Sequence, residues 1–208
     1  MHLSACLRMA ARWGNLGLAM KTLVQFHEQA EFLRESSGSN IEKTLLRAVK
    51  VLALFRIPHY VCGGFAVQEH GYPRFTVDVD IIVPDVDFAR EKLVMNGFRE
   101  NSGSKMTVTD RETKVEVDLL PGGRKVDPGP VTLPVPTHVS DEPQILTLQG
   151  LISSKLSTYI GRGIARAQDY ADVVKLIQAN DLPREYDIDQ KVCDLYHGMW
   201  DELHPTKS

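Results

Sequence analysis

Residues 74–83, with the sequence Arg-Phe-Thr-Val-Asp-Val-Asp-Ile-Ile-Val, constrain the fold of this chain more than any other segment. The alternation of polar and apolar residues predicts a β-strand, because successive side chains of a strand point to opposite faces of the sheet. The apolar face of this strand would consist of Phe75, Val77, Val79 and Ile81. The polar face would consist of Arg74, Thr76, Asp78 and Asp80. The sequence therefore predicts a strand that presents two carboxylates on one face.

The carboxylates of Asp78 and Asp80 would lie two residues apart on that polar face. Like charges at such a separation repel each other, so the arrangement carries an energetic cost. A divalent cation between them would remove this cost, and hard cations such as Mg²⁺ take carboxylate and phosphate oxygens as ligands. A bare Asp-x-Asp is also compatible with the solvated polar face of an edge strand, but the surrounding sequence favours a metal site.

A glycine pair lies shortly before the predicted carboxylate strand. Residues 59–62 form a short apolar run that indicates a buried strand, and residues 65–70 are compatible with a short helix that ends at Gly71. Gly63 and Gly64 would therefore lie at the junction of strand and helix. Glycines at such a junction let backbone N–H groups approach a phosphate closely, although a plain tight turn is the alternative interpretation.

A further acidic strand is predicted over residues 114–120, where Glu116 and Asp118 would share the polar face. Residues 105–110 and 114–120 are expected to form a hairpin around residues 111–113. The chain thus offers a third carboxylate, Asp118, near the end of a second strand.

The order of strand, Gly-Gly, short helix, Arg-x-Thr-x-Asp-x-Asp strand and later Asp-bearing strand resembles the nucleotidyltransferase superfamily, which has a polymerase-β-like fold. The chain is most similar to the small bacterial branch that includes AbiEii-type toxins and antibiotic nucleotidyltransferases, and the resemblance spans about residues 45–178. It implies an α/β (α+β) fold in which a mixed β-sheet is flanked by helices and followed by a helical C-terminal part. It also implies that two Mg²⁺ (or Mn²⁺) ions, held by Asp78, Asp80 and Asp118, bind a nucleoside triphosphate and activate an acceptor hydroxyl.

The predicted helices of the C-terminal part support this resemblance. Residues 148–160 carry a helical stripe of apolar residues, and Lys155 lies off that stripe. Residues 167–177 form a second amphipathic stretch, and the glycines at 161 and 163 indicate a break between the two helices. AbiEii-like proteins have a similar Lys helix, followed by an Arg-rich segment and an Arg-Asp pair. That pair reads Gln168-Asp169 in this chain.

The resemblance implies further roles in nucleotide binding. Gly63 and Gly64 would cradle phosphate, Lys155 would face the triphosphate as a cation, and Thr76 would belong to the same nucleotide site. A solvated basic helix face is the plainer interpretation of Lys155. Arg74 is expected to pair with a carboxylate of the site.

Composition is that of a compact globular enzyme, with 43% hydrophobic and 25% charged residues over 208 positions. A net charge of −3 argues against bulk electrostatic capture of nucleic acid, although a local basic face remains compatible with it. Three widely spaced cysteines indicate a reducing compartment, which we expect to be the cytoplasm, with neither a disulfide framework nor a zinc site. No apolar run is long enough to cross a membrane.

The predicted organisation has three parts. Residues 1–20, basic and broken by charge, are interpreted as a non-native or disordered extension, with the native start at Met20; a weak signal or transit peptide is the alternative. Residues 21–143 would form the nucleotidyltransferase-like core and residues 144–208 the helical part. Helices are expected at 22–35, 41–55 and, between Asp85 and Gly97, at 86–96.

Residues 121–143 contain six of the eleven prolines and three glycines. Proline cannot donate a ladder hydrogen bond, so this segment is not a regular central strand. We expect it to follow the surface close to the cleft.

The predicted function is a metal-dependent transfer of a nucleoside monophosphate from an NTP to a hydroxyl acceptor, which could be a small molecule, an RNA end or a protein. The alternative is a catalytically silent nucleotide-binding or toxin–antitoxin partner module on the same fold. A purely structural domain with solvated acidic strand faces is a third possibility. The presence of all three acidic positions favours the enzyme, because a silent site has no need of that repulsion. Oligomeric state is not predicted by the sequence.

Overall fold

The computed structural model describes residues 40–126 and 128–205. The predicted N-terminal extension over residues 1–20 and the predicted helix over residues 22–35 lie outside the described residues.

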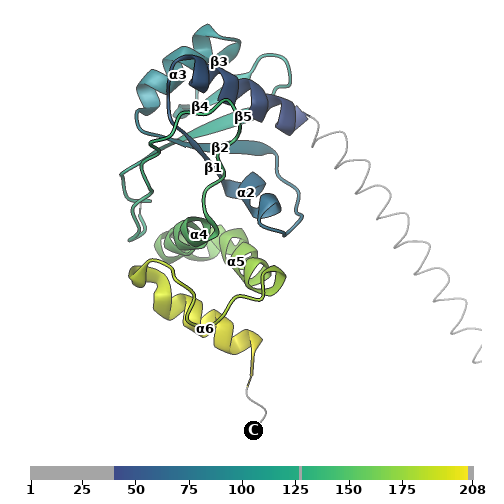
Figure 1. Ribbon diagram of the computed structural model, residues 1–208, viewed down its shortest axis with the longest axis vertical. Helices are drawn as coiled ribbons and strands as arrows, with labels where there is room; N and C mark the ends of the chain where they lie inside the picture. Colours follow the sequence, from purple (N-terminus) through teal and green to yellow (C-terminus); the bar gives the residue numbers. More distant parts are fainter. Residues whose placement is uncertain (1–39, 127, 206–208) are drawn as a thin grey trace, which may run out of the picture. The chain divides into compact units, whose positions relative to one another are not determined.

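A five-stranded mixed sheet forms the centre of the described fold, in the order β1-β2-β5-β4-β3 (Figure 1). The central strands β2 and β5 are parallel, whereas every other neighbouring pair is antiparallel. The bounds of the strands are β1 Tyr60–Cys62, β2 Asp78–Val83, β3 Phe98–Asn101, β4 Ser104–Asp110 and β5 Glu116–Pro121. The predicted fold class, a mixed sheet flanked by helices, is confirmed, and so is the hairpin of β4 and β5.

The carboxylate strand is shorter than the alternation of residues 74–83 predicts. Strand β2 begins at Asp78, and its ladder with β5 begins at the same residue, which is paired with Glu116. Phe75 and Val77 precede the ladder, and their side chains are 54% and 64% exposed. The prediction is therefore right for residues 78–83 and wrong for residues 74–77, because a periodic segment forms a strand only as far as a neighbour supplies hydrogen bonds.

One face of the sheet is covered by a helix over residues 40–54 and by α3 (Val86–Met95), both as predicted (Figure 1). The N-cap of α3 is Asp85, whose side chain accepts a hydrogen bond from the Phe88 backbone N–H at 3.0 Å. The core between these helices and the sheet includes Leu45, Val49, Val79, Ile81, Leu93, Val117 and Leu119. The apolar face of β2 and β5 is thus buried, which directs the alternate residues of both strands to the opposite face.

The opposite face is met by helix α2 (Gly63–Glu69) and by the helical C-terminal part (Figure 1). That part comprises α4 (Leu148–Arg162), the 3₁₀ turn η1 (Gly163–Arg166), α5 (Ala167–Ala179), η2 (Gln190–Val192) and α6 (Cys193–Leu203). The predicted break between two helices is confirmed, since α4 ends at Gly163, which has a φ of 58°. A second core joins these helices through Leu151, Ile152, Leu156, Val173, Leu176 and Tyr196.

The described residues of the proline-rich segment, 121–126 and 128–143, form no strand beyond the end of β5, as predicted. Its only regular pairing among the described residues is an isolated bridge between Lys125 and Thr132. Two of its side chains, Val131 and Leu133, are buried against the helical core. The helices found in the described part of the chain are all too short or too polar to cross a membrane.

Candidate active site

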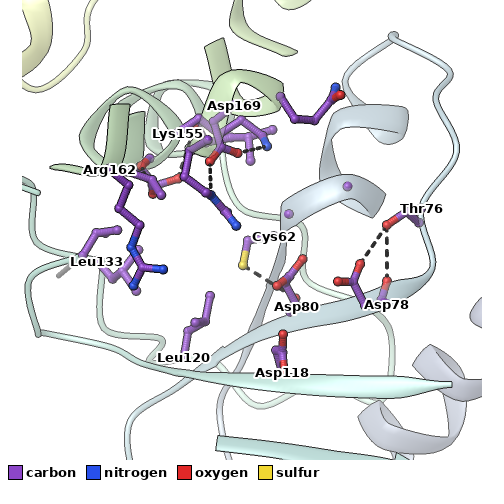
Figure 2. A pocket seen from close by; sticks show the side chains of 18 of the residues that line it. Cys62, Thr76, Asp78, Asp80, Asp118, Leu120, Leu133, Lys155, Arg162 and Asp169 are labelled. Carbon is purple, nitrogen blue, oxygen red and sulfur yellow. Dashed lines mark hydrogen bonds and ion pairs between the residues drawn. The ribbon is translucent and has the colours of Figure 1, made fainter. Parts of the chain in front are cut away.

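A cavity of about 790 Å³ lies between the polar face of the sheet and the C-terminal helices. Its lining brings together every residue that the sequence predicts for the site: Gly63, Gly64, Thr76, Asp78, Asp80, Asp118 and Lys155. These residues come from β2, β5, α2, α4 and the loop before β2. Figure 2 shows the three carboxylates on the strand side of this cavity and Lys155 on the helix side.

The carboxylates of Asp80 and Asp118 occupy directly paired positions on the parallel strands β2 and β5. Paired residues of neighbouring strands point to the same face, so both side chains face the cavity together with Asp78. Burial, followed by the charges of Asp78 and Asp118, raises the pKa of Asp80 to about 7. Lys155 and Arg166 offset only part of this rise in pKa, so the negative charge on the sheet is incompletely compensated.

The glycine pair makes room for two polar side chains. Strand β1 ends at Cys62, and α2 begins directly at Gly63, two residues earlier than predicted. Gly63 has a φ of 61°, and a Cβ atom built there would lie 1.7 Å from Asp80 Oδ2. A Cβ at Gly64 would lie 2.4 Å from Thr76 Oγ1. Side chains at either position would displace Asp80 or Thr76, which explains both glycines without reference to a ligand.

Two threonine hydroxyls hold two of the carboxylates. Thr76 Oγ1 donates to Asp78 Oδ1 at 3.0 Å, and Thr107 Oγ1 donates to Asp118 Oδ1 at 2.5 Å. Thr76 is buried in the loop before β2, and Thr107 is the β4 residue paired with Asp118. The sequence analysis missed Thr107; the hairpin predicted over residues 105–120 contained the signal, but only a fixed register identifies the partner of Asp118.

The helix side of the cavity contains a network of ion pairs. Lys155, 6% exposed, places its Nζ atom 2.9 Å from Asp169 Oδ1 and 2.7 Å from Asp172 Oδ2. Arg166 Nε lies 2.7 Å from the other oxygen of Asp169. Arg74 Nε lies 3.1 Å from the other oxygen of Asp172. Each buried carboxylate thus has two cationic partners.

Asp172 was missed by the sequence analysis, although its spacing from Asp169 places the two on one face of the predicted helix. Its full burial and its two cations make it the centre of the network. Arg74 pairs with a carboxylate, as expected, but this carboxylate is Asp172 of α5 and not one on the polar face of the strand that Arg74 was predicted to share. Arg74 precedes β2 and is not held on the polar face of that strand, so its side chain reaches α5 instead.

The donor set fits Mg²⁺ or Mn²⁺ in its chemistry, because three carboxylates, which offer hard oxygen ligands, line one cavity. The side chains are not yet arranged as a metal site. Within residues 40–126 and 128–205, no group of three or more His, Cys, Asp or Glu side chains is arranged so that it could hold a metal ion. Asp78 and Asp118 each accept a hydrogen bond from a threonine hydroxyl through one carboxylate oxygen.

The chain belongs to the family described as nucleotidyl transferase AbiEii toxin, type IV toxin–antitoxin system, which it matches over residues 44–199. The match contains all three strand carboxylates, the glycine pair and the ion network. The resemblance inferred from the sequence is therefore confirmed.

One solved structure supports the fold. A crystal structure of an antigenic nucleotidyltransferase-like protein from Paracoccidioides brasiliensis aligns with a TM-score of 0.54 and 16% identity, covering 81% of this chain and 90% of that one. Two structures of ANT(2″)-Ia are more distant. The solution structure of this antibiotic-resistance factor gives a TM-score of 0.46 at 9% identity, covering 81% of this chain and 94% of that one. The crystal structure in complex with adenylyl-2″-tobramycin gives a TM-score of 0.42 at 9% identity, covering 76% of this chain and 95% of that one. No curated protein matches the chain.

Proposed function

We propose that this protein is a metal-dependent nucleotidyltransferase that moves a nucleoside monophosphate from an NTP to a hydroxyl acceptor and releases pyrophosphate. The observation that carries the proposal is the position of Asp80 beside Asp78 and Asp118 in one cavity, where burial, followed by the charges of these two carboxylates, raises the pKa of Asp80 to about 7. Such an arrangement is unfavourable in the chain alone and becomes favourable when a cation is bound. Membership of a nucleotidyl transferase family supports the same reaction class.

Asp78, Asp80 and Asp118 would hold Mg²⁺ or Mn²⁺. Bound metal ions would neutralise the developing negative charge and lower the pKa of the attacking hydroxyl. Thr76 would orient Asp78, and Thr107 would leave one oxygen of Asp118 available to the acceptor. In this arrangement Asp118 is the group that accepts the proton of the acceptor.

The triphosphate would lie between Gly63-Gly64 and Lys155, which line the same cavity. Lys155 would act as a cation whose position is fixed in advance, because Asp169 and Asp172 hold its ammonium group. Its charge is shared with these carboxylates, so a phosphate must compete with them.

The proposed acceptor is a small molecule, an RNA end or a protein side chain. The proposed location is the cytoplasm, with which the two free cysteines of the described residues, Cys62 and Cys193, agree.

A second candidate is a catalytically silent nucleotide-binding or toxin–antitoxin partner module on this fold. It is favoured by one observation, the lack of a converged three-ligand group in the described part of the chain. Under that alternative the strand carboxylates would bind a nucleotide-associated cation without turnover.

The third carboxylate separates the two candidates. Asp78 and Asp80 suffice for a metal-bound nucleotide, whereas chemistry also requires Asp118 on the acceptor side. We expect Asp118→Asn to keep most of the NTP affinity and to lose nearly all pyrophosphate release, measured with Mg²⁺, each NTP in turn and candidate acceptors followed by mass spectrometry. The matched control is Glu116→Gln on the same strand, whose exposed carboxylate accepts a bond from Asn101 Nδ2 at 2.8 Å. Turnover of Asp118→Asn at the native rate would exclude the proposed role.

A further inference from the structure

The cavity changes character beyond Asp118. Leu120 follows two residues later on β5 and therefore faces the same side of the sheet. Val126 and Leu133, from the proline-rich segment, line the cavity next to it, together with Met106 and Pro121. Figure 2 shows Leu120, Leu133 and Arg162 grouped on one side of Asp80 and Asp118, with Thr76 and Asp78 on the other side. The cavity thus has a charged end and an apolar end.

The segment that supplies the apolar wall is internally ordered. The Gly123 backbone N–H donates to the Leu133 carbonyl at 2.9 Å, and the Leu133 N–H donates to the Arg124 carbonyl at 2.9 Å. The Val126 N–H donates to the Val131 carbonyl, also at 2.9 Å. These bonds fold the segment back on itself, which fixes Val126 and Leu133 relative to each other.

The same segment is attached to helix α4. The Val131 N–H donates to Ser157 Oγ at 2.9 Å, and a Cβ at Gly129 would lie 2.2 Å from the Ser157 carbonyl oxygen. A Cβ at Gly161 would lie 2.9 Å from the Gly129 nitrogen. Backbone therefore packs directly on backbone, as only glycine allows. The apolar wall is held against the helix that also carries Lys155 and Arg162.

A ligand that occupies the whole cavity must match both ends. The charged end, with the strand carboxylates and Gly63-Gly64, suits phosphate groups and metal ions. The other end offers apolar side chains for the face of a flat ring and, from Arg162, a planar guanidinium that stacks on aromatic systems. A phosphate group joined to a planar aromatic ring has this combination of properties.

We propose that Leu120, Val126, Leu133 and Arg162 form a subsite for a nucleobase. The inference rests on the proposed function for the presence of a nucleotide, and it adds where the ring of that nucleotide binds. The ring belongs either to the donor NTP or to a nucleoside at the end of the acceptor. The proline-rich segment is thereby a wall of the substrate site rather than a plain connection.

The test compares ligands that have the ring, the phosphates or both. Binding of ATP with Mg²⁺, of tripolyphosphate with Mg²⁺ and of adenosine is measured by calorimetry on the native chain and on Val126→Ser and Leu120→Ser. The matched control is Val77→Ser, which makes the same kind of change in the lining of the same cavity before β2. Circular dichroism and thermal melts establish that each variant is folded, and the two subsite variants lie in different elements, a strand and a loop.

We expect both subsite variants to bind ATP about tenfold more weakly, because ring contacts with apolar surface are lost. Their affinity for tripolyphosphate should be that of the native chain. The Val77→Ser control should alter neither ligand. If ATP is unaffected but adenosine binding is lost, the ring that binds is that of the acceptor, and the subsite stands. Equal affinities of native and variant chains for both ATP and adenosine would overturn it, as would a native chain that binds neither. Failure of tripolyphosphate to bind the native chain with Mg²⁺ counts against the proposed function instead, while adenosine still tests the subsite.

Discussion

Two groups of charged side chains face each other across one cavity, and they are built on opposite principles. On the sheet, the strand carboxylates Asp78, Asp80 and Asp118 line one cavity, and burial followed by the charges of the other two raises the pKa of Asp80. On the helices, the ion network of Lys155, Asp169, Asp172, Arg74 and Arg166 gives each carboxylate two cations. The first group carries a repulsion, whereas the second is compensated within the chain.

The difference separates binding from scaffold. In a compensated buried network each charge has a partner of opposite sign. Removal of one member destabilises the fold, because its partners are then buried without a counter-charge. A cluster of like charges lowers stability until a cation is bound, which supports the proposed ligand site on the sheet. Substitutions in the two groups are therefore expected to change the free energy of unfolding in opposite directions.

The largest effect is expected at the centre of the network. Asp172→Ala leaves Lys155 and Arg74 without a shared partner in a buried place, which costs about 3–5 kcal/mol of unfolding free energy. Denaturant titration measures this loss. The control is Asp201→Ala, which removes the exposed partner of Arg184 at 2.8 Å and should change stability far less, because an exposed ion pair contributes little. Equal losses in the two variants would show that the network is no more than a surface arrangement.

Lys155 connects the two groups, and its substitution should affect the ligand. If its ammonium contacts phosphate, Lys155→Ala weakens NTP binding by about 1.5–3 kcal/mol, the value for a charge-assisted hydrogen bond. Lys191→Ala, in η2, removes a charge outside the cavity and serves as the comparison. Titrations are made well below the melting temperature of both variants, because Lys155 also belongs to the network. Small and equal effects would leave Lys155 with a structural role alone.

The strand carboxylates predict an opposite, pH-dependent effect on stability. Folding raises the pKa of Asp80 from 3.8 to about 7, so between these values the folded chain binds more protons than the unfolded chain. The free energy of unfolding contributed by this group therefore falls as pH rises through that window. Asp80→Asn removes the loss. The variant should have the same free energy of unfolding as the native chain near pH 4. Above about pH 7 its free energy of unfolding should be higher by roughly 1–2 kcal/mol, after allowance for solvent screening.

Thermal melts across the pH range measure this difference. Glu116→Gln, on the neighbouring strand but exposed, should show no such pH dependence. An increase in the stability of Asp80→Asn over the native chain that is largest at acid pH would contradict the raised pKa of Asp80.

The comparison also shows which features were accessible from the sequence. Alternation within residues 78–83 and 114–120 and the glycine stops predicted the elements, because these signals are local. Asp78, Asp80 and Asp118 were brought together through the family resemblance. Three features were not accessible in this way: residues 74–77 lie outside the strand, Thr107 bonds to Asp118, and Asp172 is the centre of the ion network. They depend on sheet register and on the helix break at Gly163, which are set by tertiary packing.

The central claim is that the strand carboxylates form a cation-dependent nucleotide site, and ligand-linked unfolding tests it most directly. With Mg²⁺ and an NTP at ten times its dissociation constant, the native chain should gain about 1.4 kcal/mol of stability. Asp78→Asn combined with Asp80→Asn should abolish this gain and leave the fold intact, whereas Glu116→Gln should retain it. A native chain whose melting temperature is unchanged by millimolar Mg²⁺ and any NTP, or a double variant that responds as strongly as the native chain, would contradict the claim.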